Sequence, residues 1–92
     1  MIGYCELCNA YTDLQRHHYL FGKGIREKAE EDGLVGHICH RCHDDIHINS
    51  PAAQGLSRMI GQLKYELMKL IEGIEPNEAR QMFVRRYYKN YL

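Results

Sequence analysis

The chain is 92 residues long, and its twelve Lys and Arg balance twelve Asp and Glu, so the formal net charge is zero. This length fits a single domain over residues 1–92, and so short a chain benefits from a metal or disulfide staple. The neutral balance argues against broad electrostatic adhesion to nucleic acid, and no apolar run is long enough to cross a bilayer. The N-terminus lacks the layout of a signal peptide, so we expect a cytoplasmic location, where paired cysteines more often bind metal than form disulfides.

The first half of the chain predicts short strands and helices between two Cys-x-x-Cys turns. Residues 14–20 favour a strand, and residues 21–24 contain two glycines and must turn. Residues 25–32 are good helix formers, and residues 34–38 indicate a second short strand. A further helix over residues 40–48 begins inside the second cysteine pair.

The second half predicts two helices. Ser50 followed by Pro51 is typical of a helix start. Apolar residues then alternate at spacings of four and three, which places an apolar seam along one helix face. Such a seam more often packs on the protein's own core than on a second copy, so we expect a monomer, with a dimer as the alternative. A last helix runs from about residue 77 to residue 89. The seam consists of Leu56, Ile60, Leu63, Leu67, Leu70 and Ile74.

The two cysteine pairs predict a structural zinc site. Cys5 and Cys8 form one Cys-x-x-Cys turn, and Cys39 and Cys42 form the other. Tetrahedral Zn²⁺ takes four thiolates from two such turns, and two disulfides are the alternative. We therefore expect an α+β fold with a zinc-stapled ββα unit, a two-stranded hairpin plus a helix, over residues 1–49. A C-terminal helical extension of two helices would follow over residues 50–92.

Four histidines form a second constellation. His43 and His47 are four residues apart on the expected helix, so they share a face and can point at one metal ion. His17 and His18 are adjacent on the expected strand, where neighbouring side chains point to opposite faces. One of this pair can therefore join the metal while the other faces elsewhere in the site.

The order of these motifs resembles a known family. Cys-x-x-Cys, Arg-His-His, a strand, then Ile-Cys-x-x-Cys-His and a further His resemble the HNH (ββα-metal, treble-clef-like) endonucleases. More narrowly, RHHYLFGKGIREKAEEDGLVGHICHRCH and the ending RRYYKNYL are similar to small bacteriophage-encoded HNH proteins, which include recombinase-dependent nucleases. The resemblance covers nearly the whole chain. It implies a metal-dependent DNA endonuclease or nickase that hydrolyses phosphodiester bonds.

The resemblance also implies a role for each histidine. His18 would be the general base that activates a water molecule. His17, His43 and His47 would hold one catalytic divalent ion, which is Mg²⁺, Mn²⁺, Ni²⁺ or Zn²⁺. The helix of the ββα unit would lie against the minor groove of DNA. The implied partners are DNA and a recombinase filament or another phage or host protein.

One position departs from the family pattern. The Asn that gives the family its middle letter would stand nine residues before His43, where this chain has Leu34. That Asn normally helps to hold the His base or its loop in place. We expect Asp32 or a backbone carbonyl near Gly33 to replace it; without a replacement, the site is slow or becomes active only after a partner arranges it.

Four basic residues near the histidines are candidate phosphate contacts, which give affinity without reading sequence. An ordinary solvated surface is the alternative for each. A catalytically weak DNA- or protein-binding module acting in phage recombination, packaging or regulation is the main alternative function. A zinc protein that uses the apolar seam for assembly is the third, and it leaves the His-His pair unexplained. The candidate DNA contacts are Arg16, Lys23, Arg26 and Arg41.

Overall fold

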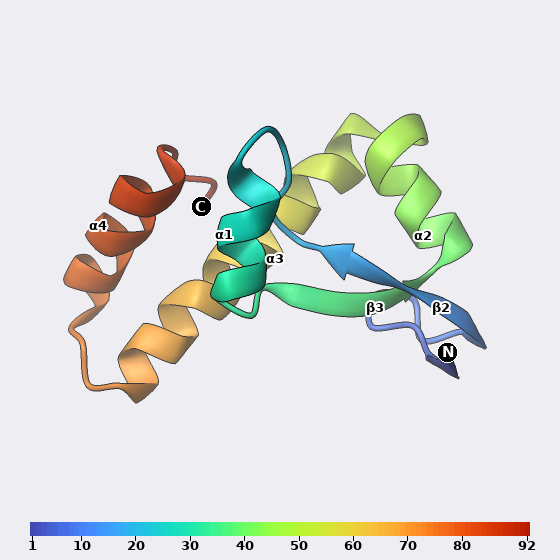
Figure 1. The fold of residues 1–92 in the computed structure, drawn as a ribbon, viewed down its shortest axis with the longest axis horizontal. Coiled ribbons are helices and arrows are strands. Elements are labelled where there is room, and N and C mark those ends of the chain that lie inside the picture. The colour runs from blue at the N-terminus through green and yellow to red at the C-terminus, as the bar shows by residue number, and fades with distance from the viewer.

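The computed structural model describes residues 1–92 and is an α+β fold, with a three-stranded antiparallel sheet, one helix between its last two strands and the other helices after the sheet in sequence (Figure 1). The strands run in the order β1-β2-β3. The elements are β1 (Ile2–Tyr4), β2 (Tyr11–His18), α1 (Ile25–Glu31), β3 (Val35–Cys39), α2 (His40–Asp44), the π-helical turn η1 (Asp45–Asn49), α3 (Pro51–Ile71) and α4 (Pro76–Tyr87).

The expected hairpin is present as β2 and β3, and its register places His17 opposite Gly36. The hairpin is extended by β1, which the sequence did not predict because its three residues are too few to show alternation. A Cβ atom at Gly36 would lie 2.6 Å from the hydroxyl of Tyr19 and closer still to the carboxylate of Glu6. Glycine is therefore required where these two side chains cross the sheet.

The helix expected over residues 40–48 is divided. α2 ends at Asp44 and continues directly into η1, where the Ser50 N–H donates to the carbonyl of Asp45 five residues back. Wider π-helical turns inside helices occur frequently at functional sites. Here the turn carries His47, one of the histidines singled out by the sequence.

The C-terminal helices pack on the ββα unit through aromatic residues. Tyr65 of α3 contacts Phe83 of α4 at a ring-centroid distance of 5.4 Å, and both belong to a core cluster with Leu20 and Leu34. Gly61 permits the approach of α3, because a Cβ there would lie 2.7 Å from Leu20 Cγ. None of the helices combines the length and apolarity needed to span a bilayer.

The apolar seam of α3 is not buried against the ββα unit, so that expectation is wrong. Leu56, Leu63 and Leu67 remain 57%, 54% and 57% exposed. The face of α3 that meets the rest of the chain is a different one, on which small and polar residues allow close approach. The buried residues of α3 are Ser57, Gly61, Gln62 and Tyr65.

Candidate metal centres

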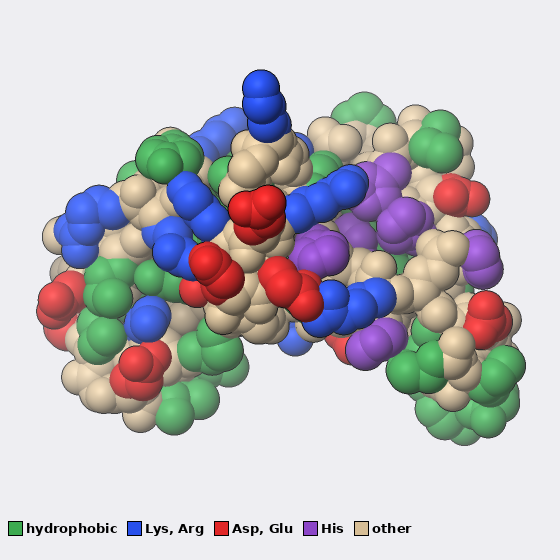
Figure 2. All heavy atoms as spheres, viewed as in Figure 1, with side chains coloured by type: hydrophobic (Ala, Val, Ile, Leu, Met, Phe, Trp, Pro, Cys, Tyr) green, Lys and Arg blue, Asp and Glu red, His purple; other side chains and the backbone are tan.

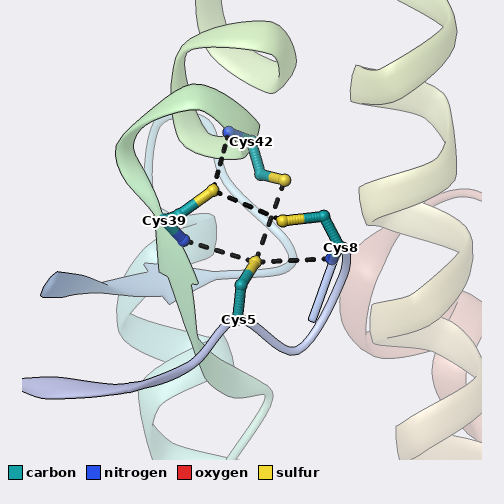
Figure 3. A group of neighbouring side chains, drawn as sticks. All are labelled: Cys5, Cys8, Cys39 and Cys42. Carbon is teal, nitrogen blue, oxygen red and sulfur yellow. Dashed lines mark hydrogen bonds between the residues drawn. The ribbon is translucent and has the colours of Figure 1, made fainter. Parts of the chain in front are cut away.

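The four cysteines converge in one cluster at the end of the sheet (Figure 3). Cys5 and Cys8 come from the turn after β1, Cys39 ends β3, and Cys42 lies on α2. All four sulfur atoms lie within 4.8 Å of one another, so the cluster could hold one metal ion. The convergence predicted from the two Cys-x-x-Cys turns is confirmed.

The spacing of the sulfurs matches a metal–thiolate tetrahedron. The Sγ atoms of Cys5 and Cys42 are 3.8 Å apart, and those of Cys8 and Cys39 are 3.7 Å apart. A tetrahedral site with metal–sulfur bonds of about 2.3 Å, the Zn–S length, has sulfur–sulfur edges of about 3.8 Å. A disulfide requires a separation of about 2.05 Å, and all four cysteines are free.

Backbone hydrogen bonds within the cluster favour the thiolate form of Cys5. Burial alone would raise the pKa of Cys5, but the backbone N–H groups of Cys8, Cys39 and Leu7 point at its sulfur and bring the pKa from 9.0 to about 6. Burial raises the pKa of Cys42, and the other sulfurs of the cluster raise it further. Four thiolates this close together therefore need a cation between them to ionise together.

Three histidines form a second cluster. His17 comes from β2, His43 from α2 and His47 from η1, and one ring nitrogen of each lies within 4.8 Å of the others. The ring centroids of His43 and His47 are 4.5 Å apart, as expected for two residues on one helical face. Three imidazoles at this spacing could hold one metal ion.

His17 is the most constrained ligand of this cluster, since it is only 1% exposed. Its Nε2 lies 2.9 Å from the hydroxyl of Ser57, and that hydroxyl donates its only hydrogen to the carbonyl of Tyr19. The His17 Nε2 must therefore be the protonated donor, which leaves the lone pair of Nδ1 for a metal. Burial, reinforced by His47 and His43, lowers the pKa of His17 from 6.5 to about 4, so the ring is neutral near pH 7.

His18 points away from the three-histidine cluster to a carboxylate. Its Nε2 lies 2.8 Å from Oε2 of Glu30 on α1, and Arg16 holds the same carboxylate at 2.6 Å. The hydrogen bond from Arg16 lowers the pKa of Glu30, with His18 adding to the effect. A carboxylate can only accept hydrogen bonds, so Nε2 of His18 carries a proton and Nδ1 is unprotonated when the ring is neutral.

Asp32, one of the two expected replacements for the family's Asn, is not a partner of His18. Leu34 is fully buried in the apolar core. Asp32 is not free to contact His18, because its carboxylate accepts hydrogen bonds from Arg86 and from the hydroxyl of Tyr87. The partner of His18 is Glu30, two residues earlier.

One pocket joins the two groups of histidines. It has a volume of about 190 Å³, enough for a phosphate group, and it is polar apart from one aromatic wall. The space-filling view shows histidine side chains gathered beside Lys and Arg on this face (Figure 2). The lining residues are Arg16, His17, His18, Phe21, Arg26, His43 and His47.

The four candidate DNA contacts have different surroundings. Arg16 is committed to Glu30, with N–O separations of 2.6 Å from both terminal nitrogens. Arg26 lines the pocket, whereas Lys23 and Arg41 are exposed outside it. Of the four, the structure places Arg16 and Arg26 directly beside the histidines.

Sequence reasoning missed three residues of the site. Ser57 contacts His17 from a helix that lies 40 residues further along the chain, and Glu30 contacts His18 from a helix 12 residues further along. Neither residue stands in a recognisable motif. Phe21 packs against His47 at a ring-centroid distance of 4.8 Å. Comparison of the chain with models of protein families, with curated proteins and with solved structures gives no match.

Proposed function

We propose that this chain is a metal-dependent DNA endonuclease or nickase of the HNH type, which hydrolyses phosphodiester bonds with His18 as general base. One observation carries the proposal: a single pocket is lined by three clustered histidines, by a fourth histidine held by a carboxylate, and by two arginines. Possible ligands for a cation, a possible proton acceptor and one uncommitted arginine, Arg26, therefore line one phosphate-sized space.

We assign the cysteine cluster to structural zinc. Four thiolates in closed tetrahedral array are typical of structural Zn²⁺ sites, because no position is left for substrate. Cys39 and Cys42 anchor the start of α2, and Cys5 and Cys8 anchor the turn before β2. The ion would thus fix the helix that carries His43 against the strand that carries His17.

We assign His17, His43 and His47 as the ligands of a divalent catalytic ion. Three neutral imidazoles leave an ion its full charge and open coordination positions. When bound, the ion supplies Lewis-acid stabilisation of the negative charge that develops on the phosphate and on the leaving oxygen.

His18 is suited to accept a proton from the attacking water. Its Nδ1 is the free nitrogen, and Glu30 holds the ring through Nε2 at 2.8 Å. The carboxylate also stabilises the imidazolium that forms after proton transfer, as in other pairs of His with a buried or paired acid. Arg16 keeps Glu30 in place, and Arg26 is free to contact the phosphate.

The alternative function is a catalytically weak DNA- or protein-binding module of the same fold. The zero net charge and the Arg16–Glu30 pair favour it, since they reduce the positive charge offered to DNA. The proposed partner of the nuclease is DNA, and that of the binding module is DNA or a protein. A recombinase filament or another phage or host protein is a second proposed partner in a phage-infected host cytoplasm.

The two functions separate in a plasmid assay. Supercoiled DNA is incubated with the protein and Mg²⁺, Mn²⁺, Ni²⁺ or Zn²⁺, with and without a recombinase filament. We expect nicked or linear product from the wild type, none from His18→Ala, and wild-type activity from His37→Ala, whose side chain lies outside the pocket. A wild type that binds but never cleaves DNA supports the binding module.

A further inference from the structure

The apolar seam of α3 is an exposed surface that neither the fold nor the proposed site uses. Three of its leucines are more than half exposed, and Leu70 is 42% exposed. Together the seam residues present roughly 500 Å² of apolar surface, as large as the largest patch on a typical monomer, and such patches mark interaction sites. The seam consists of Leu56, Ile60, Leu63, Leu67 and Leu70 on α3, and of Ile74, which the structure places beyond the end of the helix.

We propose that the seam is a homodimer interface, in which α3 of a second copy packs antiparallel against α3. Within α3 the seam residues are spaced by four, three, four and three residues, which is the spacing of the apolar positions of a coiled coil. A helix with this repeat fits best against another helix with the same repeat, because side chains of each then enter the spaces between side chains of the other. A second copy of this chain necessarily carries that repeat.

The seam is also symmetric about position 65, which suits a two-fold axis. Its four central residues in α3, which are Ile60, Leu63, Leu67 and Leu70, are spaced by three, four and three residues, and this series is the same when read in reverse. An antiparallel pair centred there places Leu63 opposite Leu67 of the second copy and Ile60 opposite Leu70 of the second copy. These four residues therefore each meet an apolar residue in a self-complementary contact, and Leu56 lies just beyond the end of the partner helix, which stops at Ile71 of the second copy.

A groove beside the seam favours this antiparallel arrangement. It has a volume of about 290 Å³, and six of its eight lining residues are hydrophobic, including Leu7, Ile46, Ala53, Leu56 and Ile60. Because Leu56 lies both in this groove and at the N-terminal end of the seam, the antiparallel pair brings the last residue of the partner helix, Ile71 of the second copy, to the groove. The exposed Ile71, 76% accessible in one chain, would be covered there.

Charged residues of α3 do not oppose this contact. Glu66 is paired with Arg80 at 3.2 Å, and Lys69 is paired with Glu72 at 3.4 Å. The ammonium group of Lys64 lies 5.4 Å from the ring centroid of Tyr19, on the side of α3 that meets the ββα unit. Packing along the seam therefore leaves no isolated charge at its centre.

The area of the seam indicates how strongly two copies of the chain should associate. Two seams bury roughly 1,000 Å² in total, near the lower limit for a specific protein interface, and the groove contacts add to this. We therefore expect a dimer with a dissociation constant in roughly the micromolar range.

The test is sedimentation equilibrium of the zinc-loaded full chain from about 1 to 300 µM. The wild type is expected to pass from monomer to dimer as its concentration rises. Leu63→Lys changes an exposed residue and is expected to raise the dissociation constant of the dimer at least about tenfold. Ile2→Lys is the matched control, since Ile2 is an exposed apolar residue on β1, and it should dimerise as the wild type does. Circular dichroism and zinc content verify that each variant is folded.

A double variant tests the direction of packing. In the antiparallel pair, Leu63→Lys with Leu67→Glu places a lysine opposite a glutamate twice, so this double variant should dimerise more strongly than Leu63→Lys alone. In a parallel pair the same changes oppose like charges and weaken dimerisation further, which would overturn the antiparallel arrangement. A wild type that stays monomeric at every concentration, or equal loss from Leu63→Lys and Ile2→Lys, would overturn the interface itself.

Discussion

The hydroxyl of Ser57 on α3 lies 2.9 Å from Nε2 of His17 on β2, and this contact joins the C-terminal extension to the three-histidine cluster. Because Ser57 also donates to Tyr19, it fixes which nitrogen of His17 carries the proton. The helical extension is therefore part of the site and not only a support for it.

The first prediction concerns that contact. Ser57→Ala removes the acceptor for His17 Nε2–H, so the ring is no longer held in one tautomer, and affinity for the second metal should fall about 10–100-fold. Calorimetric titration of the zinc-loaded protein with Mn²⁺ or Ni²⁺ measures this. Ser50→Ala is the control: it removes the N-cap of α3 and should cost about 1 kcal/mol of stability without changing metal affinity. Equal metal affinities in wild type and Ser57→Ala would contradict the account.

The second prediction concerns Glu30. Glu30→Gln keeps a hydrogen-bond acceptor but loses the charge that stabilises protonated His18, so the cleavage rate should fall at least about tenfold. The loss should not exceed the about 10²–10⁴-fold that a general base contributes. Metal affinity should not change. Glu27→Gln, on the same helix but without a hydrogen bond to His18, should cleave like the wild type; equal rates for all three proteins would refute a positioning role.

Ser57 and Glu30 also show which contacts of the site could not be predicted from the sequence. The cysteine pairs, the helical spacing of His43 and His47 and the opposite directions of His17 and His18 depend on local geometry, so the sequence predicted them. Ser57 and Glu30 act from distant elements, and their contacts depend on tertiary packing. The same is true of α3: its periodicity predicted an apolar seam, but the small residues Ser57 and Gly61 determined which face packs inward.

The third prediction concerns pH. The pKa of His17 is about 4 in the folded protein without a second metal and 6.5 ordinarily, so below pH 6.5 the unfolded chain binds a proton that the folded chain excludes. His17 therefore opposes folding progressively as pH falls from 6.5 toward 4, and this effect is absent above that window. Urea unfolding of wild type and His17→Gln should show a stability difference that shifts in favour of His17→Gln with falling pH. A difference independent of pH would show that His17 is not buried as a neutral ring.

The fourth prediction concerns the cysteine cluster. The protein should retain one tightly bound zinc per chain through dialysis, and Cys39→Ser or removal of zinc with a strong chelator should unfold the ββα unit, because metal binding contributes folding free energy to so small a core. Elemental analysis and circular dichroism measure the two effects. His40→Ser is the control, because it alters the same turn without removing a sulfur. Retention of the folded spectrum by zinc-free Cys39→Ser would contradict the structural role.

The central claim is that His18 accepts the proton while His17, His43 and His47 hold the ion, and a metal titration of plasmid cleavage tests it most directly. His43→Ala should cleave slowly at low metal and recover partly as metal concentration rises, because it lacks only a ligand. His18→Ala should lose about 10²–10⁴-fold in rate at every metal concentration while keeping zinc and DNA affinity. Cleavage by His18→Ala at the wild-type rate, or its recovery with added metal, would contradict the account.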